Sequence, residues 1–480
     1  MEIFRAYDIR GQYPTDINDE IVYKIGRILV RTFSAQKIAV GRDISLATPK
    51  IYQALVRGIL DQGCDVIDLG IAGTDVVYFA AGHFKYNAGI EITASHSAGH
   101  LSGIKIIGPE AAPFGMGFGM EKLKEDFLNY QEFSSQKKGE HIEKNIWNEF
   151  INQVLAFVDP KIIKPLKVVV DASNAVGSLE IDHLEKHLPQ IDFVKINWIL
   201  DGNYPGHQPN PFLRENRKQL EEKVRQQHAD LGIAFDGDAD RIYFVDGNGD
   251  LIFGNYINGF IAEKMCKENP GRAVVHDIRA TRFIKAQVLK SGGIPNLELV
   301  GHAFFKGRMK QENAIFGGEG TGHIYYNFGD YMVENSIIAL MQILQIISES
   351  KKSLRELAKK PRMKYPVIGE YNFALPGFSA TDDLTPAALA AMNKVLDAVR
   401  EKYSDGEISD FDTFSVKYPD WNFNIRPSNN DPLIRFSAEA TDVKLLLAKQ
   451  KEIYDLLISE GCAFVNDTGV IQFEENKTND

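Results

Sequence analysis

The chain has 480 residues, of which 44% are hydrophobic and 25% are charged, the balance of an ordinary globular protein. Its formal net charge of −11 argues against a surface for nucleic acid or for anionic membranes, so neither is expected as a partner. The opening MEIFRAYDIRG lacks the apolar segment of a signal peptide, and three distant cysteines without metal-type spacing fit a reducing compartment. A cytoplasmic location is therefore expected.

A strand–helix–strand pattern recurs along most of the chain. It begins with an apolar strand at residues 38–41, a helical stretch at 49–62 and a second strand at 65–69. Apolar runs that end at an aspartate, each followed by helical sequence, recur at residues 167–171 and 272–277. The pattern predicts three similar α/β domains with mixed sheets.

Two polar stretches are predicted to be linkers, at residues 134–144 and at KKPRMKYP, residues 359–366. Beyond them the pattern changes to turn-forming residues, short strands, and helices at 386–403 and 443–460, which predicts an α+β domain. The overall expectation is an α/β protein whose domains surround a central cleft. Its predicted domains are residues 1–148, 149–252, 253–363 and 364–480.

An apolar helix is predicted at residues 336–347. Because a helix needs about 20 residues to span a bilayer, this segment is too short and is expected to be buried.

Three alternating aspartates stand out in FDGDADRIYF, residues 235–244, between strand candidates at 230–235 and 241–246. Their carboxylates can converge on one hard cation, and this ligand set favours Mg²⁺; the residues are Asp236, Asp238 and Asp240.

The spacing of this loop allows other interpretations. An EF-hand is excluded because Arg241 stands where glycine is required and Gly247 where the bidentate glutamate is required. The spacing also fits an aspartyl-phosphate phosphatase with Asp236 as nucleophile, although Asp240 in the fifth position weakens that interpretation. A solvated acidic turn is the remaining alternative.

A second loop follows a strand candidate at residues 88–94 and reads TASHSAGHLSGIK, residues 93–105. Its glycines allow Ser95 to protrude, His96 could move a proton, and Lys105 could neutralise phosphate charge. A lone serine after a strand is more often structural. A functional role for Ser95 is indicated only together with His96 and Lys105.

Two further loops carry polar groups suited to a sugar phosphate. RPSNNDPLIR, residues 426–435, combines two arginines with hydroxyl and amide donors, a set that suits phosphate, although an arginine-capped turn is the alternative. GGEGTGH, residues 317–323, places a carboxylate and a hydroxyl where they can bind vicinal sugar hydroxyls.

Taken in chain order, these four loops resemble those of the α-D-phosphohexomutases, one loop per domain. FRAYDIRG, residues 4–11, and DGNYPGHQPNP, residues 201–211, are similar to the phosphomannomutase/phosphoglucomutase group. The resemblance implies a Mg²⁺-dependent phosphoserine enzyme that interconverts hexose 1-phosphate and hexose 6-phosphate through a hexose 1,6-bisphosphate, which also serves as activator.

The resemblance also assigns residues. It implies catalytic roles for Ser95, Lys105, Arg10, His323 and Arg241, and metal ligands in Asp236, Asp238, Asp240 and the Ser95 phosphate. It implies substrate-binding roles for Tyr7, Arg279, His302, Glu319, Thr321, Arg426, Ser428, Asn429, Asn430 and Arg435. The general base is left open among Lys105, His323 and a water oriented by Arg10.

The chain departs from the family pattern at several positions. These are Ser97-Ala98 for Asn-Pro, Ser102 for Asn, Arg279 for Lys, Thr321 for Ser, and Asn430-Asp431 for Thr-Glu. None removes the serine, an aspartate or the phosphate arginine, but the sugar preferred is left open.

Mannose and glucose phosphates are favoured as substrates. The alternatives are a phosphoglucosamine mutase, an aspartyl-phosphate phosphatase with Asp236 as nucleophile, and a non-catalytic sugar-phosphate binding protein. A monomer or a homodimer is expected, with the fourth domain moving on a hinge at residues 360–366 to let the intermediate turn end for end.

Overall fold

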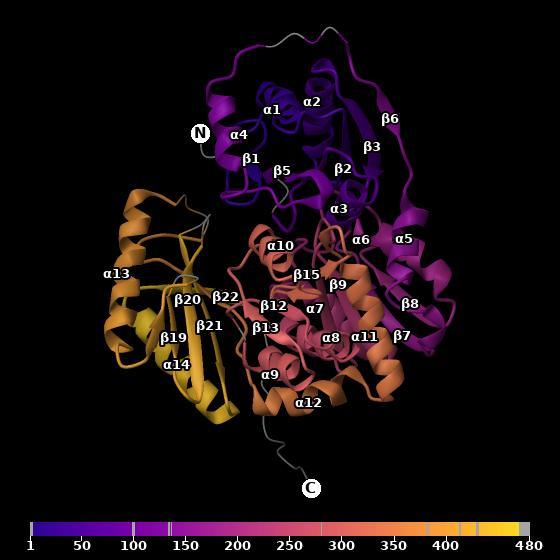
Figure 1. Ribbon diagram of the computed structural model, residues 1–480. Helices are drawn as coiled ribbons and strands as arrows, with labels where there is room; N and C mark the ends of the chain where they lie inside the picture. The colour runs from indigo at the N-terminus through magenta and orange to yellow at the C-terminus, as the bar shows by residue number, and fades with distance from the viewer. Residues whose placement is uncertain are drawn as a thin grey trace.

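The computed structural model describes residues 3–97, 101–132, 135, 137–279, 281–380, 382, 384–411, 414–428 and 432–469. Four sheets lie within these residues, three mixed and one fully antiparallel. In Figure 1 the indigo first domain lies at the top, the second and third lie beneath it, and the orange and yellow fourth lies to the left. The predicted fold class, three mixed α/β domains and an α+β domain, is confirmed.

The first domain carries a sheet of six strands. In sheet order they are β1 (Ile9–Gln12), β5 (Leu101–Ile107), β4 (Ala88–Thr93), β2 (Lys37–Arg42), β3 (Asp65–Ile71) and β6 (His141–Glu143). Its helices are α1 (Asp19–Thr32), α2 (Thr48–Asp61), α3 (Thr74–His83) and α4 (Met120–Leu128), with a short 3₁₀ helix at Pro109–Ala111. Every residue of β4 is buried, so this strand gives the serine loop a rigid origin.

The predicted linker at residues 134–144 is wrong in its last part, where His141–Glu143 form the edge strand β6. This strand pairs in parallel with β3, from Val66 to Asp68. Edge pairing uses backbone hydrogen bonds and tolerates polar side chains, so the apolar pattern of a buried strand is missing. Residues 133, 134 and 136 lie outside the described part of the chain.

The second domain carries a sheet of five strands. In sheet order they are β11 (Leu251–Ile252), β10 (Ile242–Asp246), β9 (Leu231–Phe235), β7 (Leu166–Asp171) and β8 (Ile191–Ile196). Its helices are α5 (Trp147–Leu155), α6 (Gly177–Leu184) and α7 (Arg214–Gln227), with 3₁₀ turns at Pro160–Ile162 and Glu185–His187. Strands β9 and β10 pair antiparallel, and the aspartate loop connects them.

The third domain repeats this plan. Its strands, in sheet order, are β13 (Ile294–Leu297), β12 (Ala273–His276), β14 (Phe316–Gly318), β15 (Ile324–Asn327) and β16 (Met332–Glu334). Its helices are α8 (Gly254–Glu268), α9 (Arg282–Lys290), α10 (His302–Gln311), α11 (Ser336–Ser350) and α12 (Leu354–Lys364). Helix α11 is the predicted buried helix, and among the described residues no helix is long and apolar enough to cross a membrane.

The predicted linker at residues 359–366 is wrong over its first part, because α12 continues through Pro361 to Lys364. Ser353 and Glu356 form a capping box at its start, and the buried guanidinium of Arg362 donates to the Leu251 carbonyl. Pro361 removes one helical hydrogen bond, and these anchors on both sides outweigh that loss.

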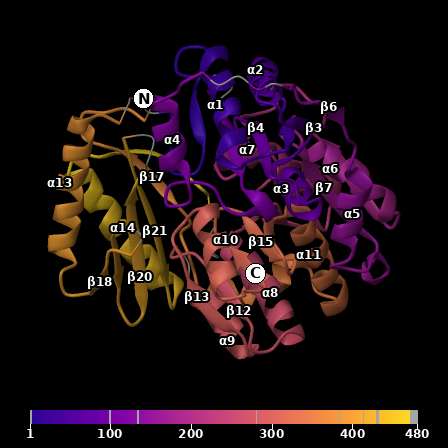
Figure 2. The same ribbon diagram turned by 45° about the horizontal axis from the view of Figure 1, so that its top comes forward.

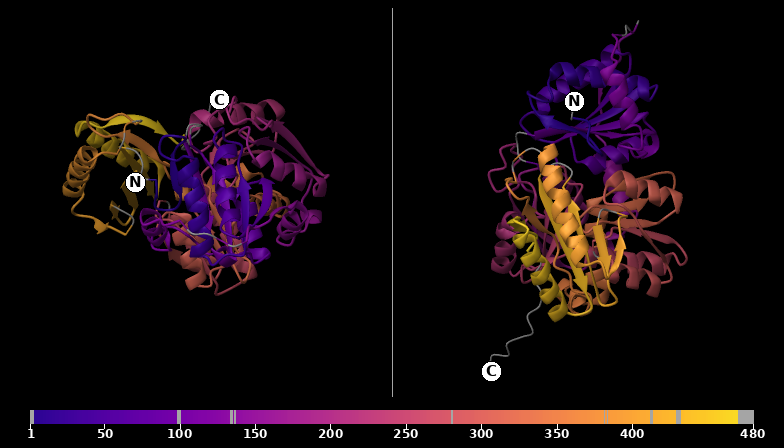
Figure 3. Two further views of the ribbon diagram at one scale, coloured as in Figure 1. Left: turned by 90° about the horizontal axis from the view of Figure 1, so that it is seen from above. Right: turned by 90° about the vertical axis from the view of Figure 1, so that its left-hand side faces the viewer.

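The fourth domain is an antiparallel sheet with two helices. Its strands, in sheet order, are β18 (Glu407–Ser409), β19 (Phe414–Lys417), β20 (Trp421–Pro427), β21 (Leu433–Ala440), β17 (Tyr371–Ala374) and β22 (Ala463–Asp467). The helices are α13 (Pro386–Lys402) and α14 (Val443–Ser459). Figure 2 and the left view of Figure 3 show this domain at the side of the other three, and the right view of Figure 3 shows it in front of the second and third.

The apolar cores explain that separation. One continuous cluster of buried side chains joins the first three domains, with members such as Phe79 in α3, Phe235 in β9 and Phe316 in β14. The fourth domain has a core of its own, which includes Trp421 and Ile453. It is therefore expected to move against the rest more readily than the first three move against one another. The domain boundaries and the central cleft stay predictions.

Arg217 of α7 fastens the fourth domain to the second. Its guanidinium is fully buried and donates to the carbonyls of Pro211 at 2.5 Å, Phe212 at 2.7 Å and Thr468 at 2.5 Å. Burial lowers its pKa to about 10, so it stays charged at neutral pH.

Replacing Arg217 by alanine is expected to lower the free energy of unfolding by about 3 kcal/mol, because buried carbonyls lose their donors. Urea unfolding followed by tryptophan fluorescence measures this. The matched control is Arg225→Ala, an exposed arginine on the same helix, which should change stability by less than about 0.5 kcal/mol. Equal stability of the two variants would contradict the fastening role.

Candidate active site

Ser95 lies at a sharp turn just after β4. Its φ is +52°, a left-handed conformation that is uncommon for a residue with a side chain. The turn is held by a hydrogen bond of 2.6 Å from the Ser95 N–H to Thr93 Oγ1, and the residue is only 1% exposed. The end of a rigid strand therefore fixes the direction of the serine hydroxyl.

The aspartate loop lies against this turn. The carboxylates of Asp236, Asp238 and Asp240 are buried, and one oxygen of each lies within 4.8 Å of the others. A Cβ at Gly237 would lie 2.3 Å from the carbonyl oxygen of Ser95, so only glycine allows the two loops to approach this closely. The structure thus brings together the predicted nucleophile and the predicted metal ligands.

Two cations tie the loops together. Lys105 on β5 donates from Nζ to Asp238 at 2.5 Å and also to Asp240. Arg241 Nε lies 3.0 Å from Asp236 Oδ2, and its Nη2 donates to Ser95 Oγ at 3.0 Å. The Arg241 guanidinium therefore bridges the serine hydroxyl and the carboxylate cluster.

The surroundings set opposite protonation states for two candidate bases. Burial acts to lower the pKa of Lys105, but the carboxylates of Asp238 and Asp240 outweigh it and raise that pKa. Burial, together with the charges of Arg241 and Lys105, lowers the pKa of His323 well below its usual value. Lys105 is therefore protonated and His323 neutral at pH 7 in this arrangement.

Arg10 and His323 approach the cluster from two sides. Arg10 Nη1 donates to Ser97 Oγ at 3.0 Å, and its Nη2 lies 2.6 Å from Asp8 Oδ2. His323 Nδ1 lies 3.7 Å from Asp240 Oδ1. Both are within the same polar region as Ser95, although neither contacts its hydroxyl directly in this structure.

Tyr7 and His302 lie together at the boundary between the first and third domains. The Tyr7 hydroxyl donates to the Val300 carbonyl at 2.8 Å, and its ring centre lies 5.6 Å from that of His302. His302 Nδ1 lies 3.3 Å from the Tyr78 hydroxyl. Burial, followed by the charge of Lys306, keeps the pKa of His302 well below its usual value, so this histidine is neutral.

The loop between β14 and β15 holds the predicted sugar-binding residues. Glu319 accepts a hydrogen bond of 2.5 Å from the Tyr325 hydroxyl. Arg279 Nη2 lies 3.4 Å from both Glu319 Oε2 and Thr321 Oγ1, and 2.5 Å from Asp277 Oδ2. Arg279 therefore lies in the same cluster of polar side chains as Glu319 and Thr321, the predicted sugar-binding residues.

The buried carboxylate of Glu370 connects the phosphate loop, residues 426–435, to this cluster of polar side chains. Arg426 Nη2 lies 3.6 Å from Glu370 Oε2, Arg435 Nη1 lies 3.7 Å from its Oε1, and Arg279 Nη1 lies 3.8 Å from its Oε2. Arg435 Nη2 also donates to Ser428 Oγ at 3.3 Å. Guanidinium groups from the third and fourth domains are thus gathered at one point.

Charges from three domains act on His96 of the serine loop. Burial lowers the pKa of His96 well below its usual value, and the charges of Arg241, Arg10 and Arg435 lower it further. These arginines come from the second, first and fourth domains. Asn429 and Asn430 lie outside the described residues, so their placement stays a prediction.

Several residues at the site were not found from the sequence. Thr74 donates to Asp238 at 2.6 Å, Lys306 lies 3.4 Å from Glu334, and Glu334 lies 3.8 Å from His323. Glu370 is the fourth residue of this kind. Its only sequence signal is a single charge in the otherwise uncharged segment PVIGEYNF, residues 366–373.

The raised pKa of Glu319 leads to a testable prediction of how stability depends on pH. Burial raises this pKa from 4.5 to about 7, against the opposing effect of Arg279. The folded protein therefore binds this proton more tightly than the unfolded chain does, and stability is lost as the pH rises from about 4.5 to about 7. The stability of Glu319→Gln relative to that of the wild type should increase by up to roughly 3 kcal/mol as the pH rises over that range.

Thermal unfolding of both proteins in EDTA at several pH values between about 5 and 8 measures the difference. Glu125→Gln, whose side chain is 65% exposed, is the control and should show no such trend. A constant difference between Glu319→Gln and wild type across this range would show that Glu319 ionises normally.

Fold and geometry together define a class: a four-domain α/β protein in which a buried serine, three aspartates and several arginines form a site suited to phosphoryl groups. The chain belongs to the phosphoglucomutase/phosphomannomutase family. It matches the α/β/α domain I of that family over residues 1–132, domain II over 148–249 and domain III over 253–365.

Individual proteins show the same similarity over nearly the full length. The chain is 35% identical over 456 residues to a protein of Xanthomonas campestris pv. campestris (strain B100) named "Phosphohexose mutases", covering 95% of this chain and 98% of that one. It is 34% identical over 465 residues to an Escherichia coli phosphomannomutase, covering 95% and 98%. A crystal structure of a phosphoglucomutase/phosphomannomutase family protein from Burkholderia thailandensis superposes with a TM-score of 0.81 at 27% identity, covering 96% and 98%.

Proposed function

We propose that this protein is a phosphohexose mutase that interconverts hexose 1-phosphate and hexose 6-phosphate, with mannose or glucose phosphate as substrate. The observation that carries the proposal is the Arg241 guanidinium, which joins Ser95 Oγ at 3.0 Å to the Asp236 carboxylate at 3.0 Å. A serine held in this way can carry a phosphoryl group beside a metal. The family and its relatives support the same activity.

The aspartate cluster fits Mg²⁺. It offers hard oxygen donors, and one buried oxygen of each of Asp236, Asp238 and Asp240 accepts no hydrogen bond, although that of Asp236 is in ion-pair contact with Arg241 Nε at 3.0 Å. These residues, with a phosphate oxygen on Ser95, would hold the ion. When bound, Mg²⁺ would offset negative charge on the phosphoryl group in transfer.

The reaction moves one phosphoryl group in each half. The hydroxyl oxygen of a hexose phosphate forms a bond to phosphorus, the bond from phosphorus to Ser95 Oγ breaks, and the hydroxyl proton passes to a base. The product is a hexose 1,6-bisphosphate. After it turns end for end, its other phosphate returns to Ser95 and the proton returns to the sugar oxygen.

The protein's cations stabilise the phosphoryl group while it moves. Arg241 contacts the serine oxygen that becomes the leaving group, and Lys105 lies between Asp238 and Asp240. Preorganised donors of this kind stabilise developing charge without reorganisation. His323 is favoured over Lys105 as the proton acceptor, because it is neutral whereas Lys105 is protonated in this arrangement.

The far end of the substrate is assigned to the loops of the third and fourth domains. Glu319 and Thr321 offer acceptors to sugar hydroxyls, and Arg426, Arg435 and Ser428 offer donors to the phosphate. Tyr7, Arg279 and His302 complete the substrate-binding set, together with Asn429 and Asn430, whereas Arg10 keeps its predicted catalytic role. Because the fourth domain has its own core, its motion can release the bisphosphate for reorientation.

Phosphorus NMR tests the activity directly. Mannose 1-phosphate and glucose 1-phosphate are each incubated with protein, Mg²⁺ and a trace of glucose 1,6-bisphosphate. Conversion to the 6-phosphate is expected and would rank the two sugars. Conversion of glucosamine 1-phosphate alone would favour a phosphoglucosamine mutase, release of free phosphate would favour a phosphatase, and no change in any spectrum would favour a binding protein.

Location and assembly complete the proposal. The three cysteines, Cys64, Cys266 and Cys462, are free and buried, which supports the reducing cytoplasm as location. A monomer or a homodimer is proposed, and light scattering of the purified chain distinguishes them.

A further inference from the structure

The buried carboxylate of Glu370 lies among three guanidinium groups, here called the arginine cluster: Arg279, Arg426 and Arg435. The residue is 3% exposed, and its oxygens lie 3.6 to 3.8 Å from the nearest nitrogen of each arginine. Burial acts to raise the pKa of Glu370, but the three arginines outweigh it and lower that pKa. A negative charge is therefore built into the group of cations that is expected to bind phosphate.

The backbone holds this charge in place independently of the arginines. The Glu370 N–H donates to Thr468 Oγ1 at 3.2 Å, and the Thr468 N–H donates back to the Glu370 carbonyl at 3.1 Å. The Thr468 carbonyl in turn accepts from Arg217 of the second domain at 2.5 Å. The carboxylate is thus fixed beside the arginine cluster and stays there when an anion enters.

Other residues orient two of the three arginines. Arg279 donates to Asp277 Oδ2 from Nε at 3.0 Å and from Nη2 at 2.5 Å. Arg435 Nη2 donates to Ser428 Oγ at 3.3 Å. Glu370 lies farther from both guanidinium groups than a hydrogen bond reaches, so it adds charge more than orientation.

The arginine cluster also keeps donors for a ligand. Within the described part of the chain, Arg279 Nη1 and Arg435 Nε are buried and donate no hydrogen bond. Buried donors of this kind normally have an acceptor, and a phosphate oxygen would supply one. A bound phosphate would then share these arginines with Glu370.

We propose that Glu370 weakens the hold of the arginine cluster on a sugar phosphate, so that the bisphosphate can be released and turned between the two half-reactions. This inference rests on the proposed function, in which these arginines bind the substrate. A phosphate monoester carries nearly two negative charges at neutral pH, and a fixed carboxylate nearby repels it. Glu370 acts through the arginines and not on the reacting atoms.

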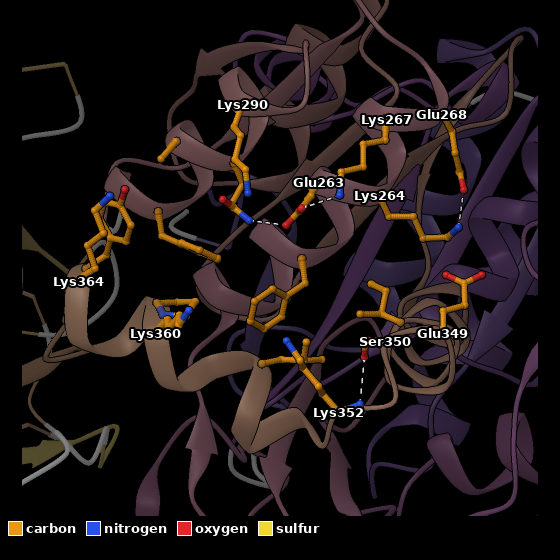
Figure 4. Close-up of a pocket in the computed structure, with 18 residues that line it drawn as sticks. Glu263, Lys264, Lys267, Glu268, Lys290, Glu349, Ser350, Lys352, Lys360 and Lys364 are labelled. Atoms are coloured by element: carbon orange, nitrogen blue, oxygen red, sulfur yellow. Dashed lines mark hydrogen bonds and ion pairs between the residues drawn. The ribbon is translucent and has the colours of Figure 1, made fainter.

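Phosphate can also meet exposed lysines away from the arginine cluster. A cavity of about 970 Å³ between α8, α9 and α12 is lined by several, among them Lys290 and Lys360 (Figure 4). Its described lining includes none of the arginines around Glu370. Lys290→Gln/Lys360→Gln therefore serves as a control for anion binding outside the proposed site.

Calorimetric titration of glucose 6-phosphate into the full chain, in EDTA to prevent turnover, tests the role of Glu370. Glu370→Gln is expected to bind at least about tenfold more tightly than wild type, because the amide removes the charge and keeps the size. Glu370→Asp keeps the charge and should bind within about threefold of wild type. The lysine control should bind within about twofold, since exposed charges are screened.

Glu439→Gln is the matched control for a buried carboxylate between the third and fourth domains. Glu439 Oε1 accepts from both the N–H and the hydroxyl of Thr281 at 2.9 Å. Among the described residues, no ion pair joins Glu439 to the arginine cluster. This variant loosens contact between the domains without changing the charge beside the arginines, so it should not bind glucose 6-phosphate more tightly than wild type.

Steady-state kinetics separates an effect of charge from damage to the fold. Glu370→Gln should lower both KM and kcat, because a bisphosphate that is held too tightly turns slowly, whereas a structural defect would raise KM. Thermal unfolding gives a second measurement if the variant is unstable. Glucose 6-phosphate should raise the unfolding temperature of Glu370→Gln by more than that of wild type, since the ligand binds the folded variant more tightly.

The proposal is overturned if Glu370→Gln binds glucose 6-phosphate no more tightly than wild type, or if Glu439→Gln tightens binding equally. A wild type that binds glucose 6-phosphate and converts glucose 1-phosphate, beside a Glu370→Gln variant of unchanged affinity, would overturn this inference alone. A wild type that neither binds nor converts any hexose phosphate would overturn the proposed function as well.

Discussion

Replacing Ser95 by alanine is expected to lower the mutase rate by at least about 10⁴-fold, because the variant has no oxygen on which to carry the phosphoryl group. The effect should fall on kcat, since Ser95 is 1% exposed and the loops that bind the substrate are left intact. Phosphorus NMR with glucose 1-phosphate and a trace of bisphosphate measures it. Binding of glucose 1-phosphate, measured by calorimetry, should remain within a few-fold of wild type.

The matched control is Ser97→Ala, two residues along the same loop. Ser97 accepts a hydrogen bond of 3.0 Å from Arg10 but does not contact Arg241 in the described structure. Its replacement should lower the rate by less than about tenfold, the scale of one lost neutral partner. A Ser95→Ala variant that still converts or hydrolyses substrate at the wild-type rate would contradict the phosphoserine mechanism and favour Asp236 as nucleophile.

Replacing Asp238 by asparagine is expected to lower the rate by at least about 10²-fold and to abolish stabilisation by Mg²⁺. One oxygen of Asp238 accepts from Thr74 at 2.6 Å and from Lys105 at 2.5 Å, and the other has no hydrogen-bond partner. An amide of nearly the same shape keeps most of the packing but removes the charge that a divalent cation requires.

Thermal unfolding with and without Mg²⁺ separates the two effects. Wild type should unfold at a higher temperature with Mg²⁺, by mass action of a ligand that binds only the folded state. Asp192→Asn, in the same domain with a side chain 65% exposed, should respond as wild type does. If Mg²⁺ raised the unfolding temperature of Asp238→Asn as much as that of wild type, the ion would have to bind elsewhere.

The proposed phosphoserine and metal ligands could be predicted from the sequence because each belongs to a short, contiguous segment. Ser95 directly follows a buried strand, and Asp236, Asp238 and Asp240 connect two others, so local pattern and chemistry agree. The structure confirms that these two loops meet. Their meeting could be predicted only from the resemblance, because the loops are more than a hundred residues apart.

Residues whose partners are distant in the sequence could not be predicted. The role of Glu370 depends on its contacts with Arg279, Arg426 and Arg435, which come from two other segments of the chain. Burial would raise its pKa, but these arginines outweigh it and lower the pKa, so Glu370 stays ionised. A single glutamate in an uncharged stretch gives no sign of this.

The two linker errors have a common cause. In both places a tertiary contact overrides local composition: β6 is held by its pairing with β3, and α12 by the contact of Arg362 with Leu251. Proline and polar residues predict loops only where no such contact exists.

Mass spectrometry of the full chain after incubation with glucose 1,6-bisphosphate and Mg²⁺ tests the phosphoserine most directly. One phosphoryl group on the peptide that contains Ser95, stable to hydroxylamine, is the predicted result. A phosphoryl group released by hydroxylamine would indicate an acyl phosphate on an aspartate, and an unmodified Ser95 peptide under conditions of turnover would contradict the mechanism.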